Sequence, residues 1–384
     1  MPGQIDRNVV MLGWVSFFTD MASAMVNPLI PVFIVTVLGE GMERLGLIVA
    51  AATFFSYALR LLSGYVSDRY GVVKPLVVGG YALSAFAKPL LGLSQGWQSV
   101  AALRILERIG KGLRSAPKDV MISRYSKSAR EGRTFGFHKT LDIAGELCGS
   151  LLLFALLLWL GEGESVLRTL FWLTLIPGSV ALLLMIFFVA DVPRAGVPAL
   201  RFALAAEDRR VIRGMLGYFC FLFFMFGDAF FTMRALGIGF GMELLPLLFI
   251  VSTAVQTLLS YPLGRLIDRR GEGEVLRLAL IAGVAAQWLL YEGRPLSLWS
   301  AYALLGLFSV ASLNANRTLI SRHACNRGSV YGVFYSGVAL FAAAGAWTVG
   351  AIWERFGTEA ALLFSLIGTT AVAALWLLAG LRRF

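Results

Sequence analysis

Charged, metal-binding and disulfide-forming residues are scarce in this sequence. Only 15% of its 384 residues are Asp, Glu, Lys or Arg, and it contains two histidines and three cysteines. His138 and His323 have no second ligand at metal-site spacing. We expect both at the protein surface or at the mouth of an internal cavity. Cys148, Cys220 and Cys325 are far apart and are expected to be packing residues. The sequence therefore predicts no metal site.

Enzyme motifs are also missing. No G-x-x-x-x-G-K-(S/T) loop for binding phosphate occurs, so ATP is not the evident energy source. We expect no cofactor and no enzymatic activity. An ion gradient is the simplest alternative source of energy.

Hydrophobic residues, by contrast, are abundant. They form 58% of the chain, and the mean hydropathy is +0.75, which would leave a soluble protein with too little polar surface. A helix needs about 20 mostly apolar residues to span a bilayer, and roughly twelve such runs can be drawn. They are 9–37, 43–63, 76–94, 97–117, 137–160, 166–190, 211–235, 243–263, 275–291, 296–320, 328–352 and 358–381. The predicted fold class is an all-α integral membrane protein with about twelve transmembrane helices.

The net charge of +11 does not indicate a nucleic-acid partner, because the basic residues gather in alternate connections between the runs. The connections on one side of the membrane, together with the C-terminal tail, hold most of the basic residues. The connections on the opposite side hold only Arg44, Arg168, Arg294 and Arg355. Basic loops stay on the cytoplasmic side. We therefore expect a multi-pass protein of the cell (inner) membrane with both termini cytoplasmic. The first run has no evident cleavage site and is not expected to be a removable signal peptide.

The chain contains an internal duplication. The segments 64–71 and 264–271 share Gly, Asp, Arg and Gly at the same spacing, each between two apolar runs. Asp20 of the first run matches Asp228 of the seventh. We expect an N-terminal six-helix bundle at 1–192, a cytoplasmic linker at 193–210 and a C-terminal six-helix bundle at 211–384. Such two-lobed membrane proteins carry solutes that bind between lobes.

The repeated turn resembles the loop G-x-x-x-D-(R/K)-x-G-(R/K)-(R/K) of the major facilitator superfamily of secondary transporters. The first copy matches through Gly64, Asp68, Arg69, Gly71 and Lys74, with Val72 and Val73 where basic residues are usual. The second copy matches more weakly, through Gly264, Asp268, Arg269 and Gly271. The resemblance implies that these residues gate the transporter, since a carboxylate and a guanidinium can pair across a seam and separate when it opens. A tight turn with orienting charges is the alternative interpretation.

The fourth run carries an ionic face. At about 100° per residue, Arg104, Glu107, Arg108, Lys111 and Arg114 fall within an arc of about 120°. Charges at bilayer depth must face water, partners or a ligand, so we expect Arg104 and Arg108 in a central cavity, whereas Arg114 and Lys118 can lie at the cytoplasmic membrane surface. The run also resembles the superfamily pattern R-x-x-x-G-x-G-x-G, which implies a role for Arg104 in substrate binding or proton transfer. The string G-K-G-x-R-x-x-P-(R/K)-D resembles that of a bacterial branch.

Other runs offer polar residues to the same cavity. The predicted cavity set is Asp20, Asn27, Arg104, Arg108, Lys111, Asp228 and Asn316. A carboxylate beside a movable cation can bind and release a proton near neutral pH. The candidates for proton coupling are Asp20, Asp142, Glu146 and Asp228, although Asp142 and Glu146 can equally be ion-pair partners of cavity cations.

The predicted function is secondary active transport by alternating access, with protons as the coupling ion. The excess of cations over acids in the N-terminal lobe favours a small anionic or zwitterionic substrate, since guanidinium groups bind carboxylate and phosphate well. One alternative is proton-driven efflux of drugs, siderophores or other amphiphiles. An alternative of another class is a membrane sensor or lipid-handling protein without transport. The expected partners are the small-molecule substrate and the lipid bilayer, and the resemblance implies a monomer.

Overall fold

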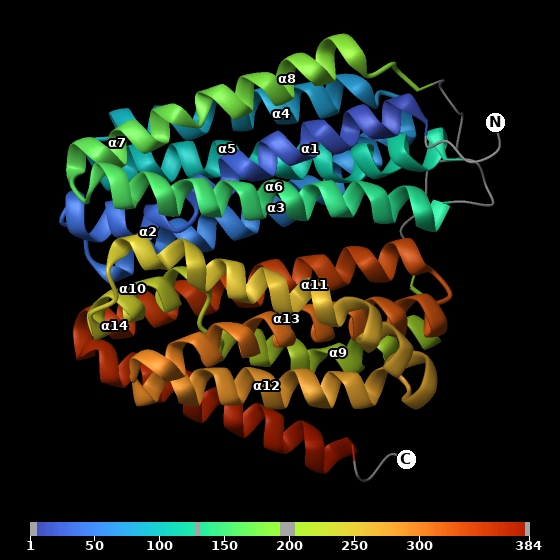
Figure 1. The fold of residues 1–384 in the computed structure, drawn as a ribbon. Helices are drawn as coiled ribbons and strands as arrows, with labels where there is room; N and C mark the ends of the chain where they lie inside the picture. Colours follow the sequence, from blue (N-terminus) through green and yellow to red (C-terminus); the bar gives the residue numbers. More distant parts are fainter. Residues whose placement is uncertain (1–5, 127–130, 193–203, 381–384) are drawn as a thin grey trace. The chain divides into compact units, whose positions relative to one another are not determined.

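The computed structural model describes residues 6–126, 131–192 and 204–380. Within these ranges the secondary structure is helical, without strands (Figure 1). The first half contains α1 (Arg7–Val26), α2 (Leu29–Val32), η1 (Phe33–Val37), α3 (Met42–Tyr70), α4 (Lys74–Leu90), η2 (Leu91–Leu93), α5 (Trp97–Tyr125), α6 (Glu131–Leu160), α7 (Glu164–Leu173) and α8 (Leu175–Phe188). The second half contains α9 (Ala206–Phe224), α10 (Asp228–Ile238), η3 (Met242–Leu244), α11 (Leu245–Arg270), α12 (Glu272–Glu292), α13 (Pro295–His323) and α14 (Arg327–Gly380).

The helices account for the expected membrane spans. Among the described residues, 10 helical runs are long and apolar enough to cross a bilayer. α14 contains two helices, because Gly357 has non-helical angles (φ 87, ψ 173) in its middle. α5 is 29 residues long but carries too many charges to be counted among the 10. With α5 and the divided α14 included, the helices agree with the predicted all-α membrane fold.

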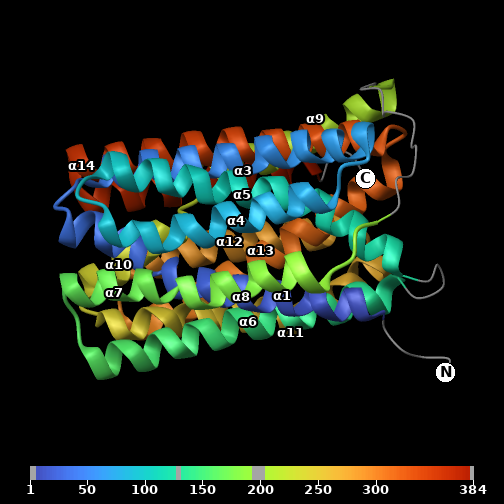
Figure 2. The ribbon, with the colours of Figure 1, turned by 90° about the horizontal axis from the view of Figure 1, so that it is seen from above.

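The chain divides into two compact units. The first unit comprises Met1–Gly39 and Ala51–Leu200, and the second comprises Glu40–Ala50 and Arg201–Phe384. In the first unit, α1 packs against α6 and α8, and α4 packs against α5 and α8 (Figures 1 and 2). In the second unit, α9 packs against α14, and α13 packs against α11 and α12. The charged helix α5 is thus held inside the first unit by α4.

The duplicated glycines end the corresponding helices of the two units. α3 ends before Gly71, which has φ 64, and α11 ends before Gly271, which has φ 86. Their backbone N–H groups donate to Ser67 and Ile267, respectively. Glycine adopts positive φ at little cost because it has no Cβ atom. The repeated sequence therefore encodes the same helix end twice.

A second pair of matching glycines allows close helix packing. A Cβ atom at Gly149 of α6 would collide with the carbonyl oxygen of Met21 in α1, and one at Gly345 of α14 would collide with that of Phe223 in α9. Gly145 lies equally close to the carbonyl oxygen of Phe17. Small residues let membrane helices approach closely. Gly145 and Gly149 therefore let α6 pack closely against α1.

The helix α9 begins at Ala206, inside the expected linker 193–210, of which 193–203 lie outside the described residues. Its start depends on Asp208, a fully buried residue. The carboxylate of Asp208 accepts hydrogen bonds of 2.8–3.2 Å from the backbone N–H groups of Ala205, Cys325 and Asn326 and from the side-chain amide of Asn326. Capping by a carboxylate stabilises the first turn of a helix, so the helix extends further toward the N-terminus than hydropathy indicated.

Candidate functional site

A buried ion pair lies on the inner face of α5. Arg104 and Glu107 are three residues apart, so one helical turn brings their side chains to the same face. Arg104 Nη1 donates to Glu107 Oε2 at 2.8 Å, and the two residues are only 8% and 2% exposed. A buried charge requires a partner of opposite sign. Glu107 therefore holds Arg104 in place.

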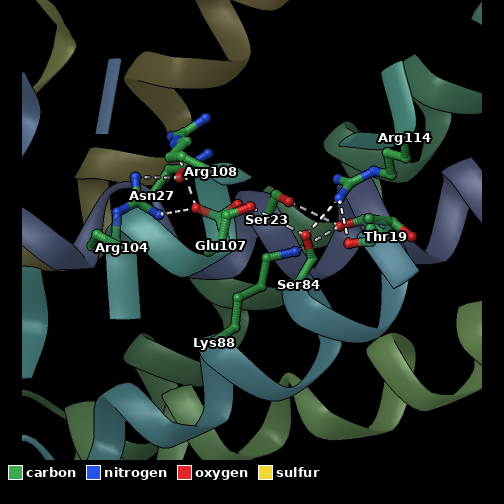
Figure 3. A network of polar contacts seen from close by, with 10 residues as sticks. Thr19, Ser23, Asn27, Ser84, Lys88, Arg104, Glu107, Arg108 and Arg114 are labelled. Atoms are coloured by element: carbon green, nitrogen blue, oxygen red, sulfur yellow. Dashed lines mark hydrogen bonds and ion pairs between the residues drawn. The ribbon is translucent and has the colours of Figure 1, made fainter. Parts of the chain in front are cut away.

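Two further predicted residues join this pair (Figure 3). Arg108 Nε lies 3.4 Å from Glu107 Oε2, and its side chain is 22% exposed. Arg104 Nη2 donates to the Asn27 side-chain oxygen at 3.5 Å, which links α5 to the end of α1. The structure thus brings together Asn27, Arg104 and Arg108, around a carboxylate that the sequence-based site did not include.

More positive charge surrounds the same region. Lys88 of α4 is 2% exposed and donates to the carbonyl oxygen of Thr19 at 3.3 Å. Arg114 donates to the carbonyl oxygen of Gly80 at 3.2 Å and to the Ser84 hydroxyl, and its guanidinium lies 4.8 Å from the centre of the Tyr81 ring. Arg114 is buried, because α4 supplies it with acceptors inside the bundle.

Positive charge is in excess in this network. Of the labelled residues in Figure 3, four are cationic, namely Lys88, Arg104, Arg108 and Arg114, and only Glu107 is acidic. Asp20 of α1 attracts the ammonium groups of Lys88 and Lys111. Arginine and lysine groups held in a medium of low dielectric constant bind carboxylate and phosphate strongly. The arrangement can bind an anion at the side of the network where Arg108 is partly exposed.

A second polar cluster lies in the same unit. The hydroxyl oxygen of Ser16 (α1) is 3.1 Å from Lys118 Nζ (α5) and 3.0 Å from His138 Nε2 (α6). His138 Nδ1 lies 3.4 Å from Asp142 Oδ1. His138 is 4% exposed, so its expected position at the surface or at a pathway mouth is wrong: α1 and α5 cover the imidazole and provide its partners.

The other predicted residues are more dispersed. Lys111 is exposed and Glu146 is half-buried. In the second unit, Asp228 is exposed at the first residue of α10. Asn316 of α13 is fully buried, and its amide nitrogen donates to the carbonyl oxygen of Ser312 at 2.8 Å. A cavity shared by these residues and Arg104 stays a prediction.

Of the repeated turns, the second has the more complete set of described contacts. Asp268 Oδ1 accepts from Arg322 Nη2 at 2.8 Å, and Arg322 also lies 3.3 Å from Glu272. His323 Nε2 is 2.7 Å from Glu272 Oε1. In the first copy Arg69 is exposed, and the side chain of Asp68 lies outside the described part of the structure. A Cβ atom at Gly64 would make an ordinary van der Waals contact with Ala116, and one at Gly264 would meet open space.

Several residues of these clusters were missing from the predicted site, among them Glu107, Lys88 and His138. Glu107 was visible on the ionic face of the fourth run, one turn from Arg104. Lys88 had a signal of its own, because it is a lone cation in an otherwise apolar run, and such residues are expensive in a membrane unless they have a function. His138 had no comparable signal, since its partners Ser16 and Lys118 are distant in the sequence.

Comparison with known proteins agrees with the fold. A sequence profile of the Major Facilitator Superfamily matches residues 12–346. An uncharacterised MFS-type transporter of Methanocaldococcus jannaschii is 30% identical over 366 residues, which are 91% of this chain and 89% of the relative. The multidrug resistance protein MdtH of Sodalis glossinidius is 25% identical over 367 residues, 89% of this chain and 82% of the relative.

Solved structures show the same fold at low sequence identity. The nucleoside transporter NupG superposes with a TM-score of 0.81 at 12% identity, covering 97% of this chain and 99% of NupG. A POT family transporter solved in complex with 5-aminolevulinic acid gives 0.80 at 11% identity, covering 98% and 96%. The chain therefore belongs to the major facilitator superfamily, as a multi-pass membrane transporter and not an enzyme.

Proposed function

We propose that this transporter moves a small anionic or zwitterionic solute across the membrane by alternating access, coupled to protons. The observation that supports this proposal is the excess of positive charge around Glu107. Arg104, Arg108, Lys88 and Arg114 are held in or near the interior of the first unit, where Glu107 pairs with Arg104 and Arg108 and Asp20 attracts Lys88, so the cations outnumber these two carboxylates. A solute that carries a carboxylate or phosphate supplies the missing negative charge.

In this proposal Arg108 makes the first contact with the solute. Its Nε lies 3.4 Å from Glu107, and the side chain is the most exposed of the three in the Arg104–Glu107–Arg108 group. Arg104 is already paired with Glu107 at 2.8 Å and positions that carboxylate. A guanidinium can bind a carboxylate with two parallel hydrogen bonds, so Arg108 can exchange Glu107 for the solute.

The cellular setting of the proposal follows from the charge pattern. We propose an inner-membrane protein with both termini cytoplasmic, in which the basic ends of α3 and α11 face the cytoplasm. The turns at Gly71 and Gly271 would then lie on the gated side, where the Asp268–Arg322 pair at 2.8 Å joins α11 to α13 within the second unit. We further propose that the transporter works as a monomer.

Uptake into proteoliposomes tests the proposed substrate class. Vesicles with the purified protein are offered radiolabelled mono- and dicarboxylates, phosphorylated solutes and amino acids, with and without an inward proton gradient. Arg108→Ala is expected to abolish uptake of the solute that the unmodified protein transports. Arg294→Ala is the matched control, because its side chain is 77% exposed. If Arg108→Ala leaves uptake intact, the role proposed for the charged network is wrong.

Efflux of drugs or other amphiphiles is the second candidate, and the relatives named MdtH favour it. Cells that express an exporter are expected to tolerate a drug panel better than cells that express Arg108→Ala. A sensor, in contrast, would bind a ligand without exchanging it. Counterflow of labelled solute between the vesicle interior and the medium therefore separates both transport candidates from a sensor.

A further inference from the structure

The cluster around Ser16 joins four helices of the first unit. Ser16 Oγ of α1 lies 3.1 Å from Lys118 Nζ of α5, 3.0 Å from His138 Nε2 of α6 and 3.5 Å from the Tyr81 hydroxyl of α4. On the other side of the imidazole, His138 Nδ1 lies 3.4 Å from Asp142 Oδ1. Ser16, Tyr81 and His138 are buried. One imidazole therefore connects a cation, a hydroxyl pair and a carboxylate.

The donors and acceptors of the cluster determine where the imidazole proton lies. The Lys118 ammonium can only donate, so Ser16 Oγ accepts from Lys118. Ser16 Oγ then has one hydrogen and one lone pair left, so it can donate to a bare His138 Nε2 or accept from a protonated one. On the other side of the ring, His138 Nδ1 faces Asp142 Oδ1 at 3.4 Å, and a carboxylate oxygen repels a bare nitrogen lone pair. The hydrogen of a neutral His138 is therefore expected on Nδ1.

The same atoms can also accommodate one additional proton. If His138 Nε2 gains a proton, it becomes a donor to Ser16 Oγ, which has two lone pairs and can accept from Lys118 as well. The Ser16 hydroxyl then turns to the Tyr81 oxygen, 3.5 Å away. The positive charge of the imidazolium lies next to Asp142, whose buried Oδ1 has no hydrogen-bond partner in the described part of the chain. Rotation of one hydroxyl group is enough to satisfy both protonation states.

We propose that His138 and Asp142 form a proton-binding site whose occupancy is controlled by Lys118. The proton enters from water and adds to His138 Nε2, so that a neutral imidazole becomes an imidazolium paired with Asp142. This inference rests on the proposed function, because it assigns the coupling proton to one place in the transporter.

The charges that face His138 come from three helices. Burial of the imidazole opposes its protonation most, Lys118 of α5 also opposes it, and Asp20 of α1 favours it. On α6 itself, the Asp142 carboxylate lies 3.4 Å from His138 Nδ1 and attracts an imidazolium, whereas Lys139 opposes protonation from a side chain that is 67% exposed. Lys118 is the half-buried cation of this set, and Ser16 links it to the imidazole. If Lys118 moves away from Ser16 during transport, the affinity of His138 for a proton rises.

Nitrogen NMR of the imidazole tests the proposal. The sequence has two histidines, so a His323→Gln background in lipid nanodiscs leaves His138 as the one labelled imidazole. At neutral pH we expect the hydrogen on Nδ1 and a bare Nε2. In a titration that extends well into the acid range, because burial opposes protonation of the imidazole, Lys118→Met is expected to raise the titration midpoint of His138 by about one pH unit or more, a tenfold gain in proton affinity. Asp142→Asn is expected to lower it by a similar amount.

Lys139→Met is the matched control, because it removes a cation that lies 3.8 Å from the same carboxylate but is largely exposed, where solvent screens its charge. The titration midpoint of His138 in the Lys139→Met variant should stay close to that of the background protein. A hydrogen on Nε2 at neutral pH overturns the proposal, and this measurement needs no substitution within the cluster. A midpoint that Lys118→Met does not raise also overturns it. If proton-driven uptake persists in that case, the proposed transport stands and the coupling proton binds elsewhere.

Discussion

Replacing Glu107 by glutamine tests how much of the first unit's stability depends on its buried carboxylate. Glutamine keeps the shape of the side chain and removes the charge that Arg104 and Arg108 share, at 2.8 and 3.4 Å. Breaking a buried ion pair by removing one partner costs about 3 to 5 kcal/mol, because the other charge is left without compensation. Arg108 is partly exposed and can turn to water, which favours the lower end, about 3 kcal/mol.

The expected loss is measurable as a shift in thermal unfolding. For a unit of this size, about 3 kcal/mol corresponds to a midpoint lower by roughly 6 to 12 °C. Unfolding of the purified protein in detergent can be followed by tryptophan fluorescence. Glu274→Gln is the control, since Glu274 pairs with Arg277 on an exposed face of α12 and such pairs contribute less than about 1 kcal/mol.

A double substitution separates the lost charge from a general packing defect. Arg104→Met combined with Glu107→Gln removes both members of the pair, and a pair of neutral side chains of similar size is tolerated better than one unpaired charge. The double variant is therefore expected to unfold at a higher temperature than Glu107→Gln alone. The reasoning is refuted if the double variant is less stable, or if Glu107→Gln and Glu274→Gln shift the midpoint equally.

Two further predictions concern helix packing and helix ends. Gly80→Ala is expected to lower the unfolding midpoint, because its Cβ atom would lie 2.5 Å from the carbonyl oxygen of Gly110, whereas Gly79→Ala, with open space, should have no such effect in the same thermal assay. Asp208→Ala is expected to destabilise the second unit, because four hydrogen-bond donors lose a buried acceptor. The control is Glu207→Ala, because Glu207 is the exposed neighbour of Asp208. Equal unfolding midpoints of the two variants would contradict the role given to Asp208.

Much of the fold could be predicted from the sequence, because run length and helical periodicity are local properties of the chain. Apolar runs long enough for a bilayer predicted the membrane class, and the spacing of the charged residues on α5 predicted its ionic face. The repeated segments 64–71 and 264–271 predicted a matching turn in each half, and both end in a glycine with positive φ, 64° and 86°. In the candidate site, the same periodicity identified Arg104 and Arg108 and placed Glu107 beside them.

The centre of the charged network required the packed helices. Lys88 is distant in sequence from Glu107, and its full burial depends on how α4 packs against α1 and α5. His138 was expected at the surface, yet it lies within hydrogen-bonding distance of Ser16 across the contact between α1 and α6. Hydropathy could not reveal this contact, because periodicity identifies a helix face without identifying its neighbour.

The sequence by itself determined that this protein is a duplicated helical membrane transporter with an ionic fourth span. Those properties follow from run length, repeat spacing and helical periodicity, which act over a few turns of chain. Tertiary structure alone decided which groups of separate helices meet: Lys88 with Thr19, Arg104 with Asn27, and His138 with Ser16. The physical reason is that a buried charge is stable only beside its partner, and packing of separate helices provides most of the partners.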